Sequence, residues 1–254
     1  MTHTIISPLT LLSFLTFLIL AQTQAQAQNE LILTVVNNCP FTIWPAIQPN
    51  SGFPVLQNGG FALSSLTHRS FRAPNTHWSG RIWARTDCTY SNGHFKCATG
   101  DCGGRLECNG LGGGPPATLA QFSLHHNQKD QSSYEVSLVD GFNLPMTVTP
   151  HEGHGLCPVV GCKPNLLQNC PGPLQFRGNG GHGPVLGCKS GCEAFNTDEL
   201  CCRGYYNSRE KCRESSYSMY FKHACPETFT YAHDSPSLVH DCSAARELKV
   251  IFCH

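Results

Sequence analysis

Sixteen cysteines in a chain of 254 residues constrain the fold of this protein more than any other feature of its sequence. The count is even, and no Cys-x-x-Cys pair occurs, so the spacing typical of zinc ribbons and thioredoxin-like redox motifs is missing. That many thiols are ordinary in an oxidising compartment and unusual in the cytosol. We therefore expect the cysteines to form disulfides, and we expect neither a metal site nor a cofactor.

The cysteines are unevenly distributed along the chain. Residues 40–87 and 109–156 contain none, whereas residues 157–225 contain nine. Strand signals, which are β-branched or alternating runs, dominate outside the cysteine-rich part. The expected strands are 31–36, 41–44, 81–85, 119–124, 134–139 and 248–252. This pattern predicts a mainly β protein with an antiparallel sandwich or barrel as its body and a disulfide-rich, loop-rich lobe attached.

Helix signals are confined to the cysteine-rich part. One short helix is expected at residues 193–202, with Gly204 as its terminator. A second is expected where Tyr217, Tyr220, Phe221 and Ala224 recur at helical spacing before Pro226. Both are short, so disulfides rather than intrinsic propensity would hold them.

The first 27 residues predict a secretory signal peptide. An apolar run from Ile5 to Leu20 is followed by Ala25-Gln26-Ala27, which has the small-x-small pattern of a cleavage site. The less favoured alternative is a membrane anchor helix, because the run is near the length that spans a bilayer. We expect cleavage near Ala27, a secreted product of residues 28–254 and no transmembrane anchor.

Charge excludes one class of partner. Lys and Arg together number 17, and so do Asp and Glu, so the formal net charge is zero. A protein that binds nucleic acid without sequence preference needs a basic surplus to neutralise phosphates. The thirteen histidines do not predict a metal centre, since His151-Glu152-Gly153-His154 is too short for the His-Glu-x-x-His helix motif.

Period-two geometry assigns the strand side chains to faces. In the strand at 119–124, Gln121 lies opposite the apolar face, and in the strand at 134–139 the same holds for Glu135. Arg81 belongs to a third alternating segment. These three side chains could project from the outer side of one sheet. A merely solvated polar face is the alternative.

Residues 93–108 resemble a known signature. Gly93, Phe95, Cys97, Thr99 and Gly100-Asp101-Cys102, with Cys108 after a short gap, match the pattern of thaumatin-like proteins, also called pathogenesis-related family five. Residues 37–44, 80–86, 137–146 and 250–253 are similar to further landmarks of that family. The resemblance covers essentially the whole expected mature chain.

The resemblance implies a three-part architecture and a disulfide pairing. A β-sandwich core would comprise residues 28–87, 119–156 and 226–254, with a small disulfide-bonded hairpin region at 88–118 and a disulfide-rich lobe at 157–225. Spacing alone does not determine the connectivity. The pairs implied by the family are Cys39–Cys253, Cys88–Cys97, Cys102–Cys108, Cys157–Cys242, Cys162–Cys225, Cys170–Cys188, Cys192–Cys201 and Cys202–Cys212.

The resemblance also implies a cleft. Antifungal members have one between the sandwich and the lobe, lined by an Arg, a Glu and three Asp residues and associated with binding or weak hydrolysis of β-1,3-glucan. Here Arg81 aligns with the arginine and Asp140 with one aspartate. Glu135 stands in place of a second aspartate, and Gln121 in place of the glutamate. Ser235 takes the position of the third aspartate, with Asp234 beside it.

The substitutions in this set favour binding over catalysis. Glycoside hydrolysis needs one carboxyl group as acid and a second as base or nucleophile, and Gln121 can serve as neither. Glu135 and Asp140 remain as candidate catalytic residues. They are five residues apart, so a regular strand would put them on opposite faces, and a bend at Asp140 would be needed.

We therefore expect a plant defence protein of the antifungal type that binds β-1,3-glucan or a related cell-wall glycan with little or no hydrolysis. Two alternatives stay open: a weak endo-β-1,3-glucanase, and a protein inhibitor of a microbial hydrolase. We expect a monomer in the apoplast rather than the vacuole. Its expected partner is a cell-wall glycan or a microbial surface.

Overall fold

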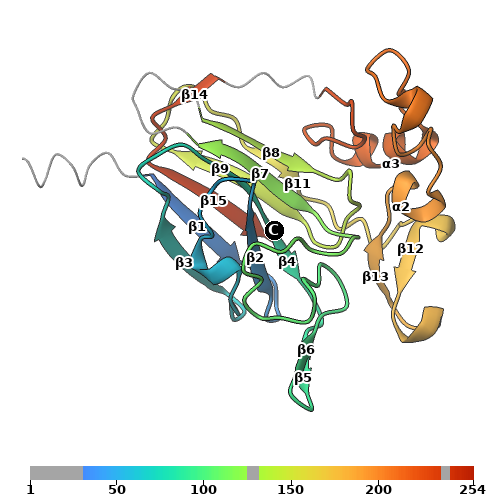
Figure 1. Cartoon of the computed structure of the whole chain (residues 1–254), viewed down its shortest axis with the longest axis horizontal. Helices are drawn as coiled ribbons and strands as arrows, with labels where there is room; N and C mark the ends of the chain where they lie inside the picture. Colours follow the sequence, from blue (N-terminus) through green and yellow to red (C-terminus); the bar gives the residue numbers. More distant parts are fainter. Residues whose placement is uncertain (1–30, 125–131, 236–240) are drawn as a thin grey trace, which may run out of the picture.

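The computed structural model describes residues 31–124, 132–235 and 241–254. It shows a mainly β body of two sheets, with a lobe carrying short helices at one side (Figure 1). The expected signal peptide lies outside the described residues. Within the described ranges, no helix is long and apolar enough to cross a membrane.

A five-stranded sheet forms one layer of the body, in the order β11-β9-β15-β1-β3. Its strands are β1 (Ile32–Asn37), β3 (Thr67–Arg72), β9 (Met146–His151), β11 (Val160–Cys162) and β15 (Glu247–Phe252). Strands β1 and β15 pair in parallel, which is consistent with their wide separation along the chain, because a tight hairpin can join only antiparallel strands. The Cys39–Cys253 disulfide follows the ends of these two strands and joins them.

A four-stranded antiparallel sheet forms the other layer, in the order β2-β4-β7-β8. Its strands are β2 (Trp44–Pro49), β4 (Trp78–Arg85), β7 (Leu119–Leu124) and β8 (Ser133–Ser137). The outer face of this sheet presents the polar side chains that the alternation of the sequence predicts.

Shorter elements complete the described fold. The two-stranded ribbons are β5 (Thr89–Ser91) with β6 (His94–Lys96), β10 (His154–Leu156) with β14 (Asp241–Ser243), and β12 (Gln175–Arg177) with β13 (Val185–Cys188). The helices are α2 (Gly191–Phe195) and α3 (Ser216–Ala224), and the 3-10 turns are η1 (Gln57–Gly59), η2 (Gly172–Leu174), η3 (Asn179–Gly181) and η4 (Gly204–Tyr206).

The strand expected at 41–44 is wrong, because β2 begins only at Trp44. The side chain of Asn37 organises the preceding segment as a turn instead. Its amide donates to the backbone oxygens of Phe41, Leu63 and Ser64 at 2.9–3.0 Å. Its Oδ1 accepts from the backbone N–H of Cys39 at 3.0 Å. One buried amide thus satisfies backbone groups that a strand ladder would otherwise pair.

The helix expected at 193–202 is also wrong in extent, since α2 covers only Gly191–Phe195. Asn196 adopts the left-handed conformation at φ 50° and ends the helix with its N–H bonded to the carbonyl of Cys192. The helix expected around 217–224 is confirmed as α3. Its N-terminus carries a capping box between Ser215 and Ser218, a local signal that fixes where the helix starts.

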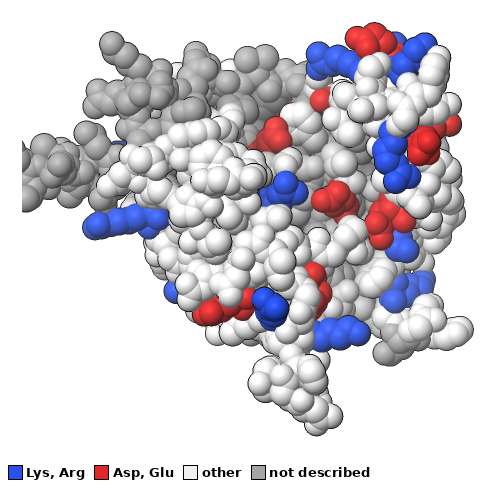
Figure 2. All heavy atoms as spheres, in the orientation of Figure 1, with Lys and Arg blue, Asp and Glu red and all other residues white. Residues whose placement is uncertain are grey.

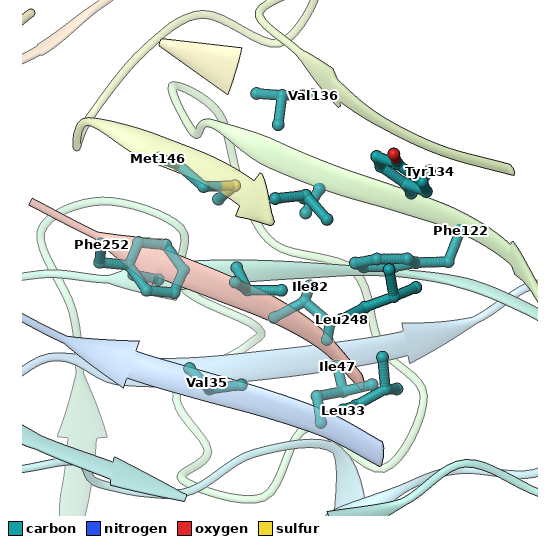
Figure 3. Packing of buried hydrophobic residues seen from close by; sticks show 14 of the residues in the cluster. Leu33, Val35, Ile47, Ile82, Phe122, Tyr134, Val136, Met146, Leu248 and Phe252 are labelled. Atoms are coloured by element: carbon teal, nitrogen blue, oxygen red, sulfur yellow. The ribbon is translucent and has the colours of Figure 1, made fainter. Parts of the chain in front are cut away.

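The main hydrophobic core lies between the two sheets (Figure 3). Leu33 and Val35 of β1 and Leu248 of β15 face Ile82 of β4 and Phe122 of β7 across the layers, and all five are buried. Burying one large aliphatic side chain is worth about 1.5–3 kcal/mol, so this core supplies the stability of the sandwich. It also keeps the four-stranded sheet rigid, which fixes the polar side chains on its other face.

The structure pairs all sixteen cysteines, in the same eight pairs that the family resemblance implies. A second hydrophobic cluster occupies the lobe, where Leu174 and Phe221 pack around Cys162, Cys188 and Cys225. Because bridged sulfurs make up much of this small core, the lobe depends on its disulfides more than the sandwich does.

Candidate functional site

Three of the sequence-predicted site residues lie side by side on the outer face of the four-stranded sheet. Arg81 of β4 is directly opposite Gln121 of β7, and Gln121 is directly opposite Glu135 of β8. Neighbouring strands are about 4.8 Å apart, so these residues form one row across the sheet. Gln48 of β2 occupies the next position in the same row, opposite Arg81.

A hydrogen bond joins two members of this row. The Nε2 of Gln121 donates to Oε1 of Glu135 at 2.9 Å. Glu135 is half-buried, and burial raises the pKa of its carboxyl group above the ordinary value of 4.5. Gln121 therefore presents an uncharged donor to a carboxylate, where a glutamate would present a second negative charge.

Asp140 reaches the same region through a turn. Strand β8 ends at Ser137, and the N–H of Gly141 bonds to the carbonyl of Leu138 at 2.9 Å. The bend that Asp140 needs is therefore present. Burial raises the pKa of the Asp140 carboxyl, and the positive charge of Arg81 acts against that rise. The charge of Arg81 therefore favours the ionised form of Asp140.

Gly141 allows the turn to pack against the lobe. Its φ is +82°, a value that residues with side chains rarely adopt. A Cβ at this position would lie 2.6 Å from the carbonyl oxygen of Cys188 in the lobe. Phe142 forms a β-bridge with the same Cys188. The absent side chain of one glycine thus lets the lobe approach the end of β8.

Arg81, Trp83 and Arg85 share one face of β4, as the alternation predicts, but they serve different purposes. Trp83 is fully buried beneath the hairpin region, the part of the chain between 88 and 118, and its Nε1 donates to Gly100 O at 2.8 Å. Arg85 is fully buried as well. Arg81 is half-buried, and it lines a groove at the surface.

Arg85 connects the sandwich to the hairpin region. Its guanidinium donates to the backbone oxygens of Trp44, Pro45, Arg105 and Leu106 at 2.6–3.3 Å. Burial lowers its pKa to about 10, although the nearby Asp101 carboxylate opposes that shift. This arginine therefore has a structural role, and the groove begins at Arg81.

The groove has a volume of about 220 Å³ and follows the outer face of β4, β7 and β8. Its walls are mostly polar. The residues that line it are Asn50, Ser79, Gly80, Arg81, Gln121, Phe122, Ser123, Ser133 and Glu135. Figure 2 shows acidic side chains around a basic one near the middle of the visible face, where the sandwich meets the lobe.

Asp234 and Ser235 are not among the residues that line this groove. The Asp234 carboxylate forms an ion pair with Lys222 of α3 at 2.6 Å and accepts from the backbone N–H of Thr230 at 2.8 Å. Ser235 accepts a hydrogen bond from Arg209. The structure therefore commits Asp234 to closing the loop at 230–235, whereas Arg81, Gln121 and Glu135 come together in one row. Asp140 does not line the groove either, and the charge of Arg81 is what links it to the row.

Sequence reasoning missed several residues at this face. Ser79, Ser123 and Ser133 each lie two positions from a named residue, so the same period-two rule would have found them. Glu227 lies in the turn before Phe229 and does not line the groove. Its Oε2 is buried and has no hydrogen-bond partner among the described residues.

The groups at this site suit recognition of a neutral, hydroxyl-rich ligand. An arginine, an amide, carboxylates and serines can all hydrogen-bond to sugar hydroxyls. Within the described ranges, no three His, Cys, Asp or Glu side chains are grouped as metal ligands.

Comparisons with known proteins show which proteins this chain is similar to. The chain is 70% identical over 250 residues to an osmotin-like protein of Solanum lycopersicum, covering 98% of this chain and 97% of that one. It is 45% identical to a thaumatin-like protein of Arabidopsis thaliana, covering 85% and 87% of the two chains. Among solved structures it is similar to a thaumatin-like xylanase inhibitor, with a TM-score of 0.48, 24% identity, and coverage of 87% of this chain and 99% of that one.

The model of the thaumatin family matches residues 37–254, which include all eight disulfides and every strand described above except β1. With that match and the relatives in tomato and Arabidopsis, this chain belongs to the thaumatin family.

Proposed function

We propose that this protein is a secreted plant defence protein whose groove binds β-1,3-glucan or a related cell-wall glycan, with little or no hydrolysis. Its similarity to a pathogenesis-related thaumatin-like protein of Cryptomeria japonica, at 42% identity over 223 residues, supports the defence role. Eight disulfides support secretion, because such bridges persist in oxidising compartments. The apoplast is the compartment that we propose.

The hydrogen bond from Gln121 to Glu135 carries the preference for binding. A glycoside hydrolase of the usual kind uses two carboxyl groups, one to protonate the leaving oxygen and one as base or nucleophile. An amide at position 121 can do neither, yet it still donates and accepts hydrogen bonds. The row of Arg81, Gln121 and Glu135 therefore keeps the capacity to bind a sugar after losing one acid.

One observation favours a second candidate function, a weak endo-β-1,3-glucanase. Burial raises the pKa of both Glu135 and Asp140, and a raised pKa is what a general acid needs near neutral pH. Arg81 favours the ionised form of Asp140. In this alternative, Glu135 would protonate the leaving oxygen and Asp140 would act as base or nucleophile.

Pull-down on insoluble β-1,3-glucan, combined with a reducing-sugar assay on the same samples, separates these functions. Binding without sugar release supports the proposal. Release that Glu135→Gln abolishes supports the glucanase instead. Asp198→Asn serves as a control, because Asp198 is an exposed carboxylate of the lobe, outside the groove. If the glucan neither binds nor breaks down, and a microbial hydrolase is inhibited instead, the glycan proposal is wrong.

A further inference from the structure

The groove continues past the row of Arg81, Gln121 and Glu135. A second row lies beside it, in which Ser79 of β4 is opposite Ser123 of β7 and Ser123 is opposite Ser133 of β8. Each serine is two residues from its neighbour in the first row, so the rows share a face and lie about 7 Å apart. All three serines line the groove.

Neighbouring side chains hold two of the serine hydroxyls in place. Asn50 donates through Nδ2 to Ser79 Oγ at 2.7 Å, and Ser79 Oγ donates to the backbone oxygen of Phe122 at 3.0 Å. His77 Nε2 lies 3.0 Å from Ser123 Oγ. The second row is therefore an ordered array of hydroxyl and amide groups.

The two ends of the groove differ in charge. The first row carries a guanidinium and a carboxylate, and Asp140 adjoins it, whereas the serine row and Asn50 carry no formal charge. Arg81 Nε is buried and has no hydrogen-bond partner within the described chain.

We propose that the serine row is a second sugar subsite, so that the groove binds a linear neutral oligosaccharide along β4, β7 and β8 rather than a single sugar. This inference rests on the proposed glycan-binding function and names the form of ligand that the groove takes. Serine hydroxyls and the Asn50 amide can exchange hydrogen bonds with sugar hydroxyls, and they provide no cation for an anionic polymer. Their short side chains keep this end of the groove open.

The length of the ligand tests the inference. We would measure the affinity of the whole protein for glucose and for β-1,3-gluco-oligosaccharides of increasing length by calorimetry. The test variant is Ser123→Val/Ser133→Val, because valine suits a strand while it removes both hydroxyls and narrows the groove. The control is Ser91→Val, at an exposed position of β5 in the hairpin region. Near-ultraviolet circular dichroism and Ser133→Ala show whether any loss arises from misfolding.

The inference expects wild-type affinity to rise from glucose, which fills one row, to the disaccharide, which spans both rows. In the double variant, the disaccharide and longer chains should lose about tenfold in affinity, the scale of one or two lost hydrogen bonds, whereas glucose should bind as before. If every length binds wild type equally, or if the variant weakens every length equally, the subsite is wrong although glycan binding stands. If no length binds at all, the proposed function fails, and the subsite fails with it.

Discussion

The Nε2 of Gln121 lies 2.9 Å from the Oε1 of Glu135, and the two residues are directly opposite each other on neighbouring strands. A neutral donor therefore faces a half-buried carboxylate at the centre of the groove. The amide avoids the repulsion that two carboxylates would have here, and this gives a physical reason for a glutamine at position 121 that does not depend on catalysis.

Gln121→Glu should destabilise the protein at neutral pH. It would place two carboxylates opposite each other on one face, an arrangement that costs about 1 kcal/mol of unfolding free energy. The loss should disappear below about pH 4, where both groups take up protons. Guanidinium unfolding at neutral pH and below about pH 4 measures the loss of unfolding free energy. Gln48→Glu is the matched control, because a carboxylate at either position would face Arg81, but only the one at position 121 would also face Glu135. An equal loss in both variants would contradict the explanation.

Gln121→Glu should not lower glucan affinity, and it should raise any hydrolysis, because it restores a second carboxyl group beside Glu135. Reducing-sugar release by the variant and the wild type, at equal amounts of bound protein, measures this. A variant that binds glucan more weakly while it remains folded would count against the role of this row in recognition.

The effect of Glu135→Gln on the free energy of unfolding should become more favourable as pH rises. Burial raises the pKa of Glu135 in the folded state, so the folded protein holds this proton more tightly than the unfolded chain does. The stability that protonated Glu135 contributes to the wild type is therefore fully present below the ordinary glutamate pKa of 4.5. It is lost as the pH rises through the higher pKa that Glu135 has in the folded state. A glutamine at position 135 does not titrate, so the variant does not lose stability in this way, and its side-chain oxygen can still accept the hydrogen bond from Gln121.

Guanidinium unfolding of Glu135→Gln and wild type at several pH values from 3 to 7 provides the check. The difference in unfolding free energy, variant minus wild type, should increase with pH and then level off. A difference that stays constant over this range would show that burial does not perturb Glu135.

Asp234→Asn should reduce stability without weakening glucan binding. The side chain of Asp234 is 7% exposed and forms an ion pair with Lys222 at 2.6 Å. Removing one charge of a largely buried pair lowers the free energy of unfolding by about 3 kcal/mol. Asp198→Asn provides the comparison, because the Arg203–Asp198 pair is more than half exposed and should contribute below about 0.5 kcal/mol. Thermal unfolding and glucan pull-down of both variants make the test. If the Asp234→Asn variant is folded but no longer binds glucan, the prediction is wrong and Asp234 takes part in binding.

Arg85→Lys should cost about 3 kcal/mol or more. A lysine cannot reproduce the set of donors that Arg85 directs at the carbonyls of Trp44, Pro45, Arg105 and Leu106, so buried acceptors would lose their partners. Chemical unfolding measures the loss, and Arg105→Lys is the control, because the side chain of Arg105 is exposed. Equal stability of the two variants would argue against Arg85 as the link between sandwich and hairpin region.

Local patterns predicted much of this protein. Alternation along the strands placed Gln121 and Glu135 on the outer face, because neighbouring side chains of any strand point to opposite sides. The helix at α3 followed from its apolar spacing. Local patterns failed at 41–44 and 193–202, where Asn37 and Asn196 organise a turn and a helix end through their own side chains and backbone. The sequence did not reveal that an asparagine would act this way at these two positions.

Sequence by itself determined the class of fold, the disulfide framework through a family signature, and the face on which each strand side chain lies, since these depend on the chain's local geometry or its covalent chemistry. Only the tertiary structure decided that β4, β7 and β8 are neighbours in a register that aligns Arg81, Gln121 and Glu135, and that Asp234 pairs with Lys222 outside the groove. Such contacts join segments far apart in the chain, and packing of the whole molecule selects them.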